Sequence, residues 1–198
     1  MVTASDFQPV TPKLFVWHAY EPEVKCELSS CALNGPDGLT FIDPIALAAP
    51  ALGRLLHGRR PCAIILTNAN HARAAEQLRA SLRIPVFASV EAEGLDIVPD
   101  VTLTDRQSAP GGRQVVALPG AGSGEIALVG SDVACIGDAL INLAPEGFRT
   151  LPEKYCEDAG QLRRSLRKLL SYEFQLMTFA HGVPLIGGAR QQLAQLLA

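Results

Sequence analysis

Short apolar runs separated by turn-forming residues predict that the chain begins with a β-rich segment. Residues 14–17, 25–33 and 39–42 have the apolar and β-branched pattern of strands. The connection over residues 34–38 reads Asn-Gly-Pro-Asp-Gly, which predicts a tight turn because Asn and Gly tolerate positive φ and Pro fixes its own φ. We therefore expect a β-hairpin, followed by a helix over residues 46–56 with its leucines on one side.

The middle of the chain alternates strand and helix patterns. A buried strand over residues 63–66 precedes a polar corner, a helix over residues 73–82 and a second buried strand over residues 84–88. This spacing predicts a right-handed βαβ unit with two parallel strands. Residues 91–110 are polar and poorly periodic, which predicts mixed loop with one weak strand near residues 101–103.

The second half of the chain follows the same order, strands first and helices after them. The pattern predicts strands at 114–118, 126–129, 133–136 and 176–179, a long connection over 142–158, and helices over 161–171 and 187–197. Two β-rich halves with accompanying helices fit two sheets packed face to face, with helices outside both. No linker divides the chain. We therefore predict one α/β (α+β) domain over residues 1–198, a four-layer αββα sandwich.

The composition narrows the classes of function. Of the 198 residues, 48% are hydrophobic, and the formal net charge is -3, which is typical of a globular domain and disfavours nucleic-acid or anionic-membrane binding. No apolar run approaches the roughly 20 residues that span a bilayer, and residues 1–12 lack a signal-peptide pattern. Five cysteines without a Cys-x-x-Cys pair predict small buried thiols in a reducing cytoplasm.

The polar corner after residues 63–66 is the leading candidate for a site. It places Asn68, Asn70, His71, Ala72 and Arg73 between the carboxyl end of a strand and the start of a helix. The corner resembles the metal-binding loop of the metallo-β-lactamase fold, which reads His-x-His-x-Asp-His after an apolar run ending in Thr. Four more segments resemble landmarks of that family in the same order: residues 38–44, 117–124, 134–140 and 179–184. The resemblance covers nearly the whole chain and implies the αββα fold.

The resemblance also implies a set of metal ligands, which in the family hold two zinc ions and turn water into hydroxide. Only two of the matching positions, Asp138 and His181, keep a residue that binds zinc well. Asn is a neutral and poor zinc ligand, Ala has no donor atom, and Arg brings a fixed positive charge. We therefore expect no dinuclear zinc site and no resident cofactor. The substituted positions are Asn68, Asn70, Ala72, Arg73 and Ala121.

His71 lies one residue away from the family's ligand positions, and two interpretations stay open. In a shifted loop, His71 points inward and forms with Asp138 and His181 a site for one divalent ion, Zn, Fe or Mn. In an unshifted loop, it caps the helix start and faces solvent. Arg73 is either an exposed first-turn residue or, as we hypothesise, the cation that pairs with Asp138 in place of the lost metal charge, directly or through water.

Three functions follow from these residues. We favour a metal-free relative of the metallo-hydrolases that has lost hydrolysis and binds an unknown small molecule or protein. The alternative is a metal-dependent hydrolase with a reduced mononuclear site built on Asp138 and His181, helped by His71. The third is a structural or regulatory protein without a ligand, for which a homodimer is one expected form.

Overall fold

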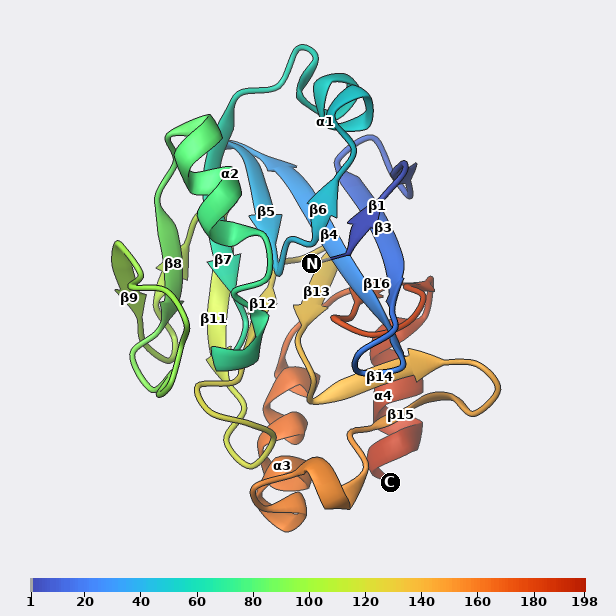
Figure 1. Ribbon diagram of the computed structural model, residues 1–198. Coiled ribbons are helices and arrows are strands. Elements are labelled where there is room, and N and C mark those ends of the chain that lie inside the picture. Colours follow the sequence, from blue (N-terminus) through green and yellow to red (C-terminus); the bar gives the residue numbers. More distant parts are fainter. Residues whose placement is uncertain (1) are drawn as a thin grey trace.

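Two β-sheets form the centre of the structure, a computed structural model that describes residues 2–198 (Figure 1). The neighbours β5, β7, β8 and β9 of the first sheet run parallel, and the other pairs in that sheet run antiparallel. The strands of the first sheet, in spatial order, are β2 (Gln8–Pro9), β3 (Leu14–Glu21), β4 (Cys26–Gly35), β5 (Gly38–Ile42), β7 (Pro61–Leu66), β8 (Val86–Ser89) and β9 (Val101–Leu103).

The second sheet has one parallel pair, β13 with β16, and is otherwise antiparallel. In spatial order its strands are β10 (Ser108–Ala109), β11 (Arg113–Ala117), β12 (Ile126–Val129), β13 (Val133–Ile136), β16 (Leu176–Thr178) and β17 (Leu185–Ile186). Two small pairs complete the strands: β1 (Thr3–Ala4) with β6 (Ala46–Leu47), and the hairpin of β14 (Leu140–Leu143) and β15 (Gly147–Thr150).

Helices cover the outer faces of both sheets. Apolar residues of α1 (Ala49–Leu56) and α2 (Ala75–Leu82) pack on the first sheet. On the second sheet lie α3 (Ala159–Leu166), its continuation η3 (Arg167–Ser171) and α4 (Ala189–Leu197). Two further single-turn 3₁₀ helices are η1 (Ala69–His71) and η2 (Glu153–Tyr155). The predicted αββα sandwich is therefore confirmed, and Figure 1 shows the two helix groups on opposite sides of the sheets.

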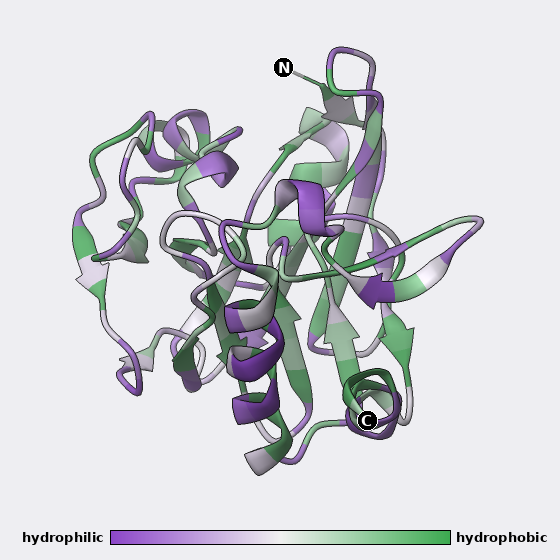
Figure 2. Ribbon diagram, turned by 90° about the horizontal axis from the view of Figure 1, so that it is seen from below, coloured by the Kyte–Doolittle hydropathy of each residue, from purple (hydrophilic) through white to green (hydrophobic). Residues whose placement is uncertain are grey.

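The central strands are apolar on both faces, because one face meets helices and the other meets the second sheet. In β7, Ile64 and Leu66 belong to the core under α1 and α2, whereas Ile65 lies in the core between the sheets. Leu128 and Cys135 enter that same inner core from β12 and β13. In Figure 2 the strands are mostly green, while the purple hydrophilic segments concentrate in helices and loops.

Several predicted boundaries need correction. The helix predicted over 46–56 begins only at Ala49, with Pro50 in its first turn, because a proline is tolerated there. The helix predicted over 73–82 begins at Ala75, and the one predicted over 161–171 is split between α3 and η3. The long connection predicted over 142–158 was wrong in part, since β14 and β15 pair through it.

Both sheets present strand ends to one common region. Asp43 follows β5, Thr67 follows β7, Asp138 lies two residues after β13, and His181 lies three residues after β16. A backbone hydrogen bond joins the two sheets here: the amide of Ile126, at the start of β12, donates to the carbonyl of Thr67, 2.8 Å away. Within residues 2–198, none of the helices is long and apolar enough to cross a membrane.

Candidate functional site

The polar corner turns through one 3₁₀ turn, and this turn decides which side chain points inward. Asn68 is the N-cap of η1, and its side-chain oxygen accepts a hydrogen bond from the amide of Asn70 at 2.9 Å. His71 is thereby turned into the protein, where it is only 2% exposed, while Asn70 lies on the surface. The interpretation that His71 faces solvent was wrong.

Both nitrogens of the His71 ring meet carboxylates. Nδ1 lies 3.1 Å from Oδ2 of Asp43 and 3.0 Å from Oγ1 of Thr67, and Nε2 lies 3.2 Å from Oδ1 of Asp138. Asp43 is held in turn by Thr67, whose amide and hydroxyl donate to its two oxygens at 2.8 and 2.5 Å. Burial lowers the pKa of His71, but the charges of Asp43 and Asp138 outweigh it and raise that pKa to about 9.

His181 approaches the same carboxylate from the opposite sheet. Its Nε2 lies 3.1 Å from Oδ1 of Asp138, and its Nδ1 donates to the carbonyl of Glu27 at 3.0 Å. The Sγ atom of Cys26 lies 3.3 Å from the same Nδ1. Burial lowers the pKa of His181, but hydrogen bonds to Asp138 and Cys26 and the charge of Asp138 raise it to about 10.

Asp138 is therefore the shared acceptor of the site. Oδ1 faces both imidazoles, and Oδ2 accepts a hydrogen bond from Nδ2 of Asn68 at 3.1 Å. Burial raises its pKa, yet the charge of His71 and the hydrogen bond from His181 hold that pKa well below the ordinary value. Burial also raises the pKa of Asp43, but the charge and hydrogen bond of His71 and the charge of Arg73 outweigh it, so that pKa is lowered.

Glu125 is a site residue that the sequence analysis missed. It is 3% exposed, its Oε2 accepts from Nδ2 of Asn68 at 2.7 Å, and its Oε1 accepts from the amide of Ala139 at 2.9 Å. Burial and the charge of Asp138 raise its pKa to about 8. The sequence did contain a signal for Glu125, because it stands directly before the apolar run of β12. An acidic residue buried there is costly unless it has hydrogen-bond partners.

Arg73 makes no direct ion pair with Asp138, and it is not the exposed first-turn residue of the other interpretation; pairing through water stays a prediction. Its guanidinium donates to the carbonyls of Ser29 (2.8 Å) and Asp43 (3.0 Å) through Nη1, and to that of Ala180 (3.4 Å) through Nη2. Within residues 2–198, none of the ion pairs closer than 4.0 Å involves Arg73. The direct partners of Asp138 are instead the two imidazoles, at 3.2 Å for His71 and 3.1 Å for His181.

The remaining substituted positions lie outside this cluster. Ala72 is buried, and its carbonyl accepts from the amide of Ala75 at the start of α2. Ala121 lies in the core under α3, and its carbonyl accepts from the amide of Glu157. Together with exposed Asn70, these residues provide no ligand in the region of Asp138, so the donors do not fit two metal ions.

Three side chains of the site lie close enough together to bind one metal ion. One donor atom from each of His71, Asp138 and His181 can be chosen so that all lie within 4.8 Å of one another. Four ligands around zinc lie about 3.3 Å apart, close to the 3.1 and 3.2 Å found here between the Nε2 atoms and Oδ1. The Nδ1 atoms are held by Asp43 and by the carbonyl of Glu27, as outer partners of metal-bound histidines usually are. The donors therefore fit one divalent ion.

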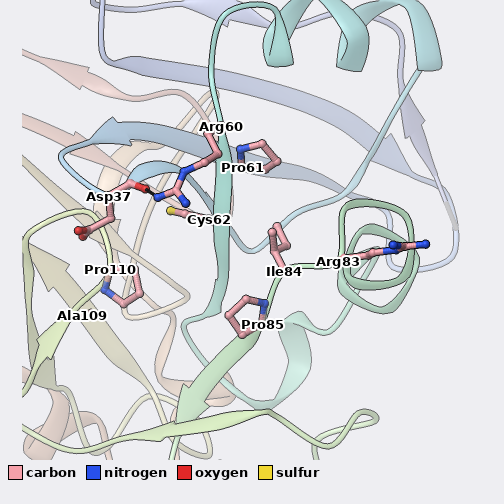
Figure 3. Close-up of a pocket in the computed structure, with 9 residues that line it drawn as sticks. All are labelled: Asp37, Arg60, Pro61, Cys62, Arg83, Ile84, Pro85, Ala109 and Pro110. Atoms are coloured by element: carbon pink, nitrogen blue, oxygen red, sulfur yellow. Dashed lines mark hydrogen bonds between the residues drawn. The ribbon is translucent and has the colours of Figure 1, made fainter.

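A surface cavity lies at the other end of the first sheet (Figure 3). Its volume is about 550 Å³, and Pro61 at the start of β7 and Pro85 just before β8 line it. Arg60 donates to the carbonyl of Asp37 at its edge, 2.8 Å away. The cavity thus lies at the amino ends of β7 and β8, whereas the site follows the carboxyl end of β7, and none of the site residues line the cavity.

Comparison with known proteins identifies the family. The model of the metallo-beta-lactamase superfamily matches residues 9–193, so the chain belongs to that superfamily. Similar solved structures include a metallo-beta-lactamase from Pontibacter korlensis (TM-score 0.74, 15% identity, covering 97% of this chain and 98% of that chain). Another is a metallo-beta-lactamase from Hirschia baltica (TM-score 0.73, 13% identity, covering 98% of both chains). A beta-lactamase domain protein from Burkholderia ambifaria has TM-score 0.73 and 17% identity, covering 98% of this chain and 74% of that chain. No curated protein matches the chain.

Proposed function

We propose that this protein has lost the two-metal hydrolysis of its superfamily and binds a small anionic molecule at a site that works without a resident metal. One observation carries the proposal: Nε2 of His71 and Nε2 of His181 both face Oδ1 of Asp138, at 3.2 and 3.1 Å. Their Nδ1 atoms face acceptors too, so each ring holds one proton there. Each Nε2 must then carry a second proton or bind a cation.

Protons are favoured over a metal for two reasons. Despite burial, the neighbouring carboxylates raise the pKa of both histidines, so an ion must displace two protons at neutral pH, which weakens its binding. In addition, the positive charge of Arg73 opposes any further cation, as its lowering effect on the pKa of both histidines indicates. The two imidazoliums supply the positive charge that metals supply in the family.

The charge of the site argues for an anionic ligand. Arg73 and the two imidazoliums contribute three positive charges, and Asp43 and Asp138 contribute two negative ones. Glu125, with a pKa of about 8, is mostly protonated at pH 7. The side chains of Asp138 and His181 are 18% and 19% exposed, so a small ligand can reach this net positive region from solvent.

The second candidate function is a metal-dependent hydrolase with one ion, and the distances among the three donors favour it. His71, Asp138 and His181 would hold Zn, Fe or Mn. Such an ion supplies a water molecule that ionises near neutral pH. In that case His181 would be held through its Nδ1 proton by Glu27, and Asp43 would orient His71 in the same way.

Metal analysis separates the two candidates. The protein would be produced in medium supplemented with zinc, iron and manganese and purified without chelator. We expect well under one ion per chain and the same melting temperature with and without EDTA. One ion per chain, together with a large fall in melting temperature on EDTA treatment, would overturn the metal-free site and support the single-metal candidate instead. The variant His71→Gln should then lose the ion, while His57→Gln, on the surface, should keep it.

Anion binding has its own test. Sodium acetate should raise the melting temperature of the wild-type protein at constant ionic strength, whereas sodium chloride should not. The acetate effect should disappear in His181→Gln, because this variant removes one of the two exposed site groups. An equal response to both salts would rule out an anion site of the kind proposed.

A further inference from the structure

Cys31 and Cys135 face each other in the core between the two sheets. Cys31 belongs to β4 of the first sheet and Cys135 to β13 of the second, and their Sγ atoms lie 3.9 Å apart. Both are buried, at 3% and 0% exposure, so the prediction of small buried thiols is confirmed for this pair. It needs correction for Cys26, Cys62 and Cys156, which are half-buried and contact nitrogen or oxygen atoms instead of a second sulfur.

The positions of the two sulfurs suit a disulfide bond. A disulfide holds its sulfurs about 2.05 Å apart, so Sγ of Cys31 and Sγ of Cys135 must come about 2 Å closer. Rotation about the Cα–Cβ bonds of both side chains can shorten this gap. In immunoglobulin domains a disulfide joins facing strands of two packed sheets, which shows that the strands of a sandwich can come close enough for such a bond.

The pair is polarised, with Cys135 as the more acidic thiol. The thiol of Cys31 donates to Sγ of Cys135, and Arg113 contributes a positive charge nearby. The hydrogen bond and this charge lower the pKa of Cys135 although burial raises it, while the same hydrogen bond and burial raise the pKa of Cys31. Thiol–disulfide exchange begins with a thiolate, so Cys135 is the sulfur that attacks first.

We infer that Cys31 and Cys135 form a disulfide that ties the two sheets together when the chain folds in the presence of a small-molecule disulfide. The sulfur of Cys135 loses its proton and attacks one sulfur of the oxidant, whose own S–S bond breaks, and the released thiolate takes up that proton. Cys31 then attacks the sulfur of Cys135, and the second small thiol leaves with the proton of Cys31. The protein loses two hydrogens, and the oxidant is reduced to two thiols.

Burial determines when this reaction occurs. The core between the sheets excludes a small-molecule disulfide, so exchange takes place while the chain folds or in a molecule whose sheets have separated. The same burial then shields the finished bond from reductants. The inference goes beyond the proposed function and does not depend on what the candidate site binds.

The bond would also connect the two halves of the candidate site. Ser30 is next to Cys31, and its hydroxyl donates to the carbonyl of Asp43 at 2.6 Å. Asp138 lies three positions after Cys135. The two cysteines are 104 positions apart, and a cross-link that closes so long a loop strongly restricts the unfolded chain. We therefore expect the oxidised protein to be the more stable form.

The test refolds the full chain from urea with a mixture of oxidised and reduced glutathione and, in parallel, with excess dithiothreitol. Peptide mapping by mass spectrometry should find Cys31 linked to Cys135 only in the first sample. Trypsin leaves Cys26 and Cys31 in one peptide, so the mapping is repeated in Cys26→Ser. The oxidised protein should melt about 10 °C above the reduced one. Cys135→Ala should lose both the link and this difference, while the matched variant Cys62→Ala should keep both.

Three results would overturn the inference. The first is the absence of the link between Cys31 and Cys135 in the wild-type protein refolded with glutathione, and the second is equal amounts of links among all five cysteines. The third is a linked protein that melts no higher than the reduced one. The wild-type mapping needs no variant, so the inference stays testable even if Cys135→Ala fails to fold. Acetate binding and metal content are measured separately, so a failure here is distinct from a failure of the proposed function.

Discussion

The corner that carries His71 and the loop that carries His181 bring an imidazole to the same oxygen by different routes. His181 occupies a position where the family resemblance expects a histidine, and its backbone simply follows β16. His71 lies one residue away from any expected ligand, and a single 3₁₀ turn capped by Asn68 brings it inward. Its Nε2 nevertheless ends 3.2 Å from Asp138, against 3.1 Å for His181.

The comparison teaches that two different backbone paths can each bring a positively charged partner to Asp138. A partly buried carboxylate beside Asn68 and Glu125 needs cationic partners, and two imidazoles meet that need. Arg73, the obvious cation in the sequence, is occupied by backbone carbonyls instead. The course of the local backbone thus determines that histidines, and not Arg73, are the direct partners of Asp138.

Removing the shared acceptor should have the largest effect. In Asp138→Asn, His71 and His181 lose the charge that holds both rings, and we expect the free energy of unfolding at pH 7 to fall by about 3–5 kcal/mol. Urea denaturation measures this. The exposed control Asp96→Asn should change stability by less than about 0.5 kcal/mol. A loss below about 1 kcal/mol in Asp138→Asn would mean that the two histidines do not depend on this carboxylate.

Alkaline pH should lower the stability of the protein over different pH ranges for His71 in the corner and His181 in the loop. The folded-state pKa of His71 is raised from 6.5 to about 9, so its contribution to stability is complete below pH 6.5 and is lost as pH rises through about 9. The corresponding loss for His181 extends to about pH 10, and Glu125 adds a loss through about pH 8. The part due to His71 is on the order of 3 kcal/mol.

Urea denaturation at several pH values checks this dependence. His71→Gln should flatten the decline between about pH 7 and pH 9, because it removes one of the titrating groups. The surface variant His57→Gln should leave the decline as it is in the wild-type protein. Equal slopes in wild type and His71→Gln would contradict the assignment of a charged His71 at neutral pH.

Gly137 packs so closely against the side chains of Thr67 and Glu125 that there is no room for an added methyl group. A Cβ at Gly137 would lie 2.3 Å from Oγ1 of Thr67 and 2.8 Å from Oε1 of Glu125. Gly137→Ala should therefore cost about 1–3 kcal/mol. Gly53→Ala is the matched control, since a Cβ there meets nothing within 4 Å and the helix α1 should gain about 0.5–1 kcal/mol. Thermal melting distinguishes these opposite signs, and a stabilised Gly137→Ala would be inconsistent with the packed site.

The smallest contrast concerns two neighbouring asparagines of the corner. Asn68 caps η1 and donates to both Asp138 and Glu125, so Asn68→Ala should cost about 2 kcal/mol. Asn70 is exposed, and Asn70→Ala should stay within about 0.5 kcal/mol of wild type. Similar losses for both variants in urea denaturation would refute the assigned role of the cap.

Much of the fold was predictable because apolar periodicity and turn residues act locally. The βαβ unit around β7 and β8 and the strands of both sheets follow from such patterns. The hairpin of β14 and β15 was missed because β15, Gly-Phe-Arg-Thr, has only one apolar side chain, Phe148. The break between α3 and η3 was missed because the leucine stripe continues across it.

The site was only partly predictable, since its decisive contacts join distant positions. Asp138 and His181 were found from landmarks, but the inward turn of His71 depends on the hydrogen bond between Asn68 and the amide of Asn70. Cys26 and His181 are 155 positions apart, and nothing near either residue indicates their contact. Contacts of this kind depend on how the two sheets are packed.

The protonation of the two rings tests the central claim most directly. Nitrogen NMR of ¹⁵N-histidine-labelled protein at about pH 7, assigned with His71→Gln and His181→Gln, reports the state of each nitrogen. We predict protons on both nitrogens of both rings, because pKa values of about 9 and about 10 leave each imidazole charged. An unprotonated Nε2 in either ring would contradict the account and would point to a cation other than a proton beside Asp138.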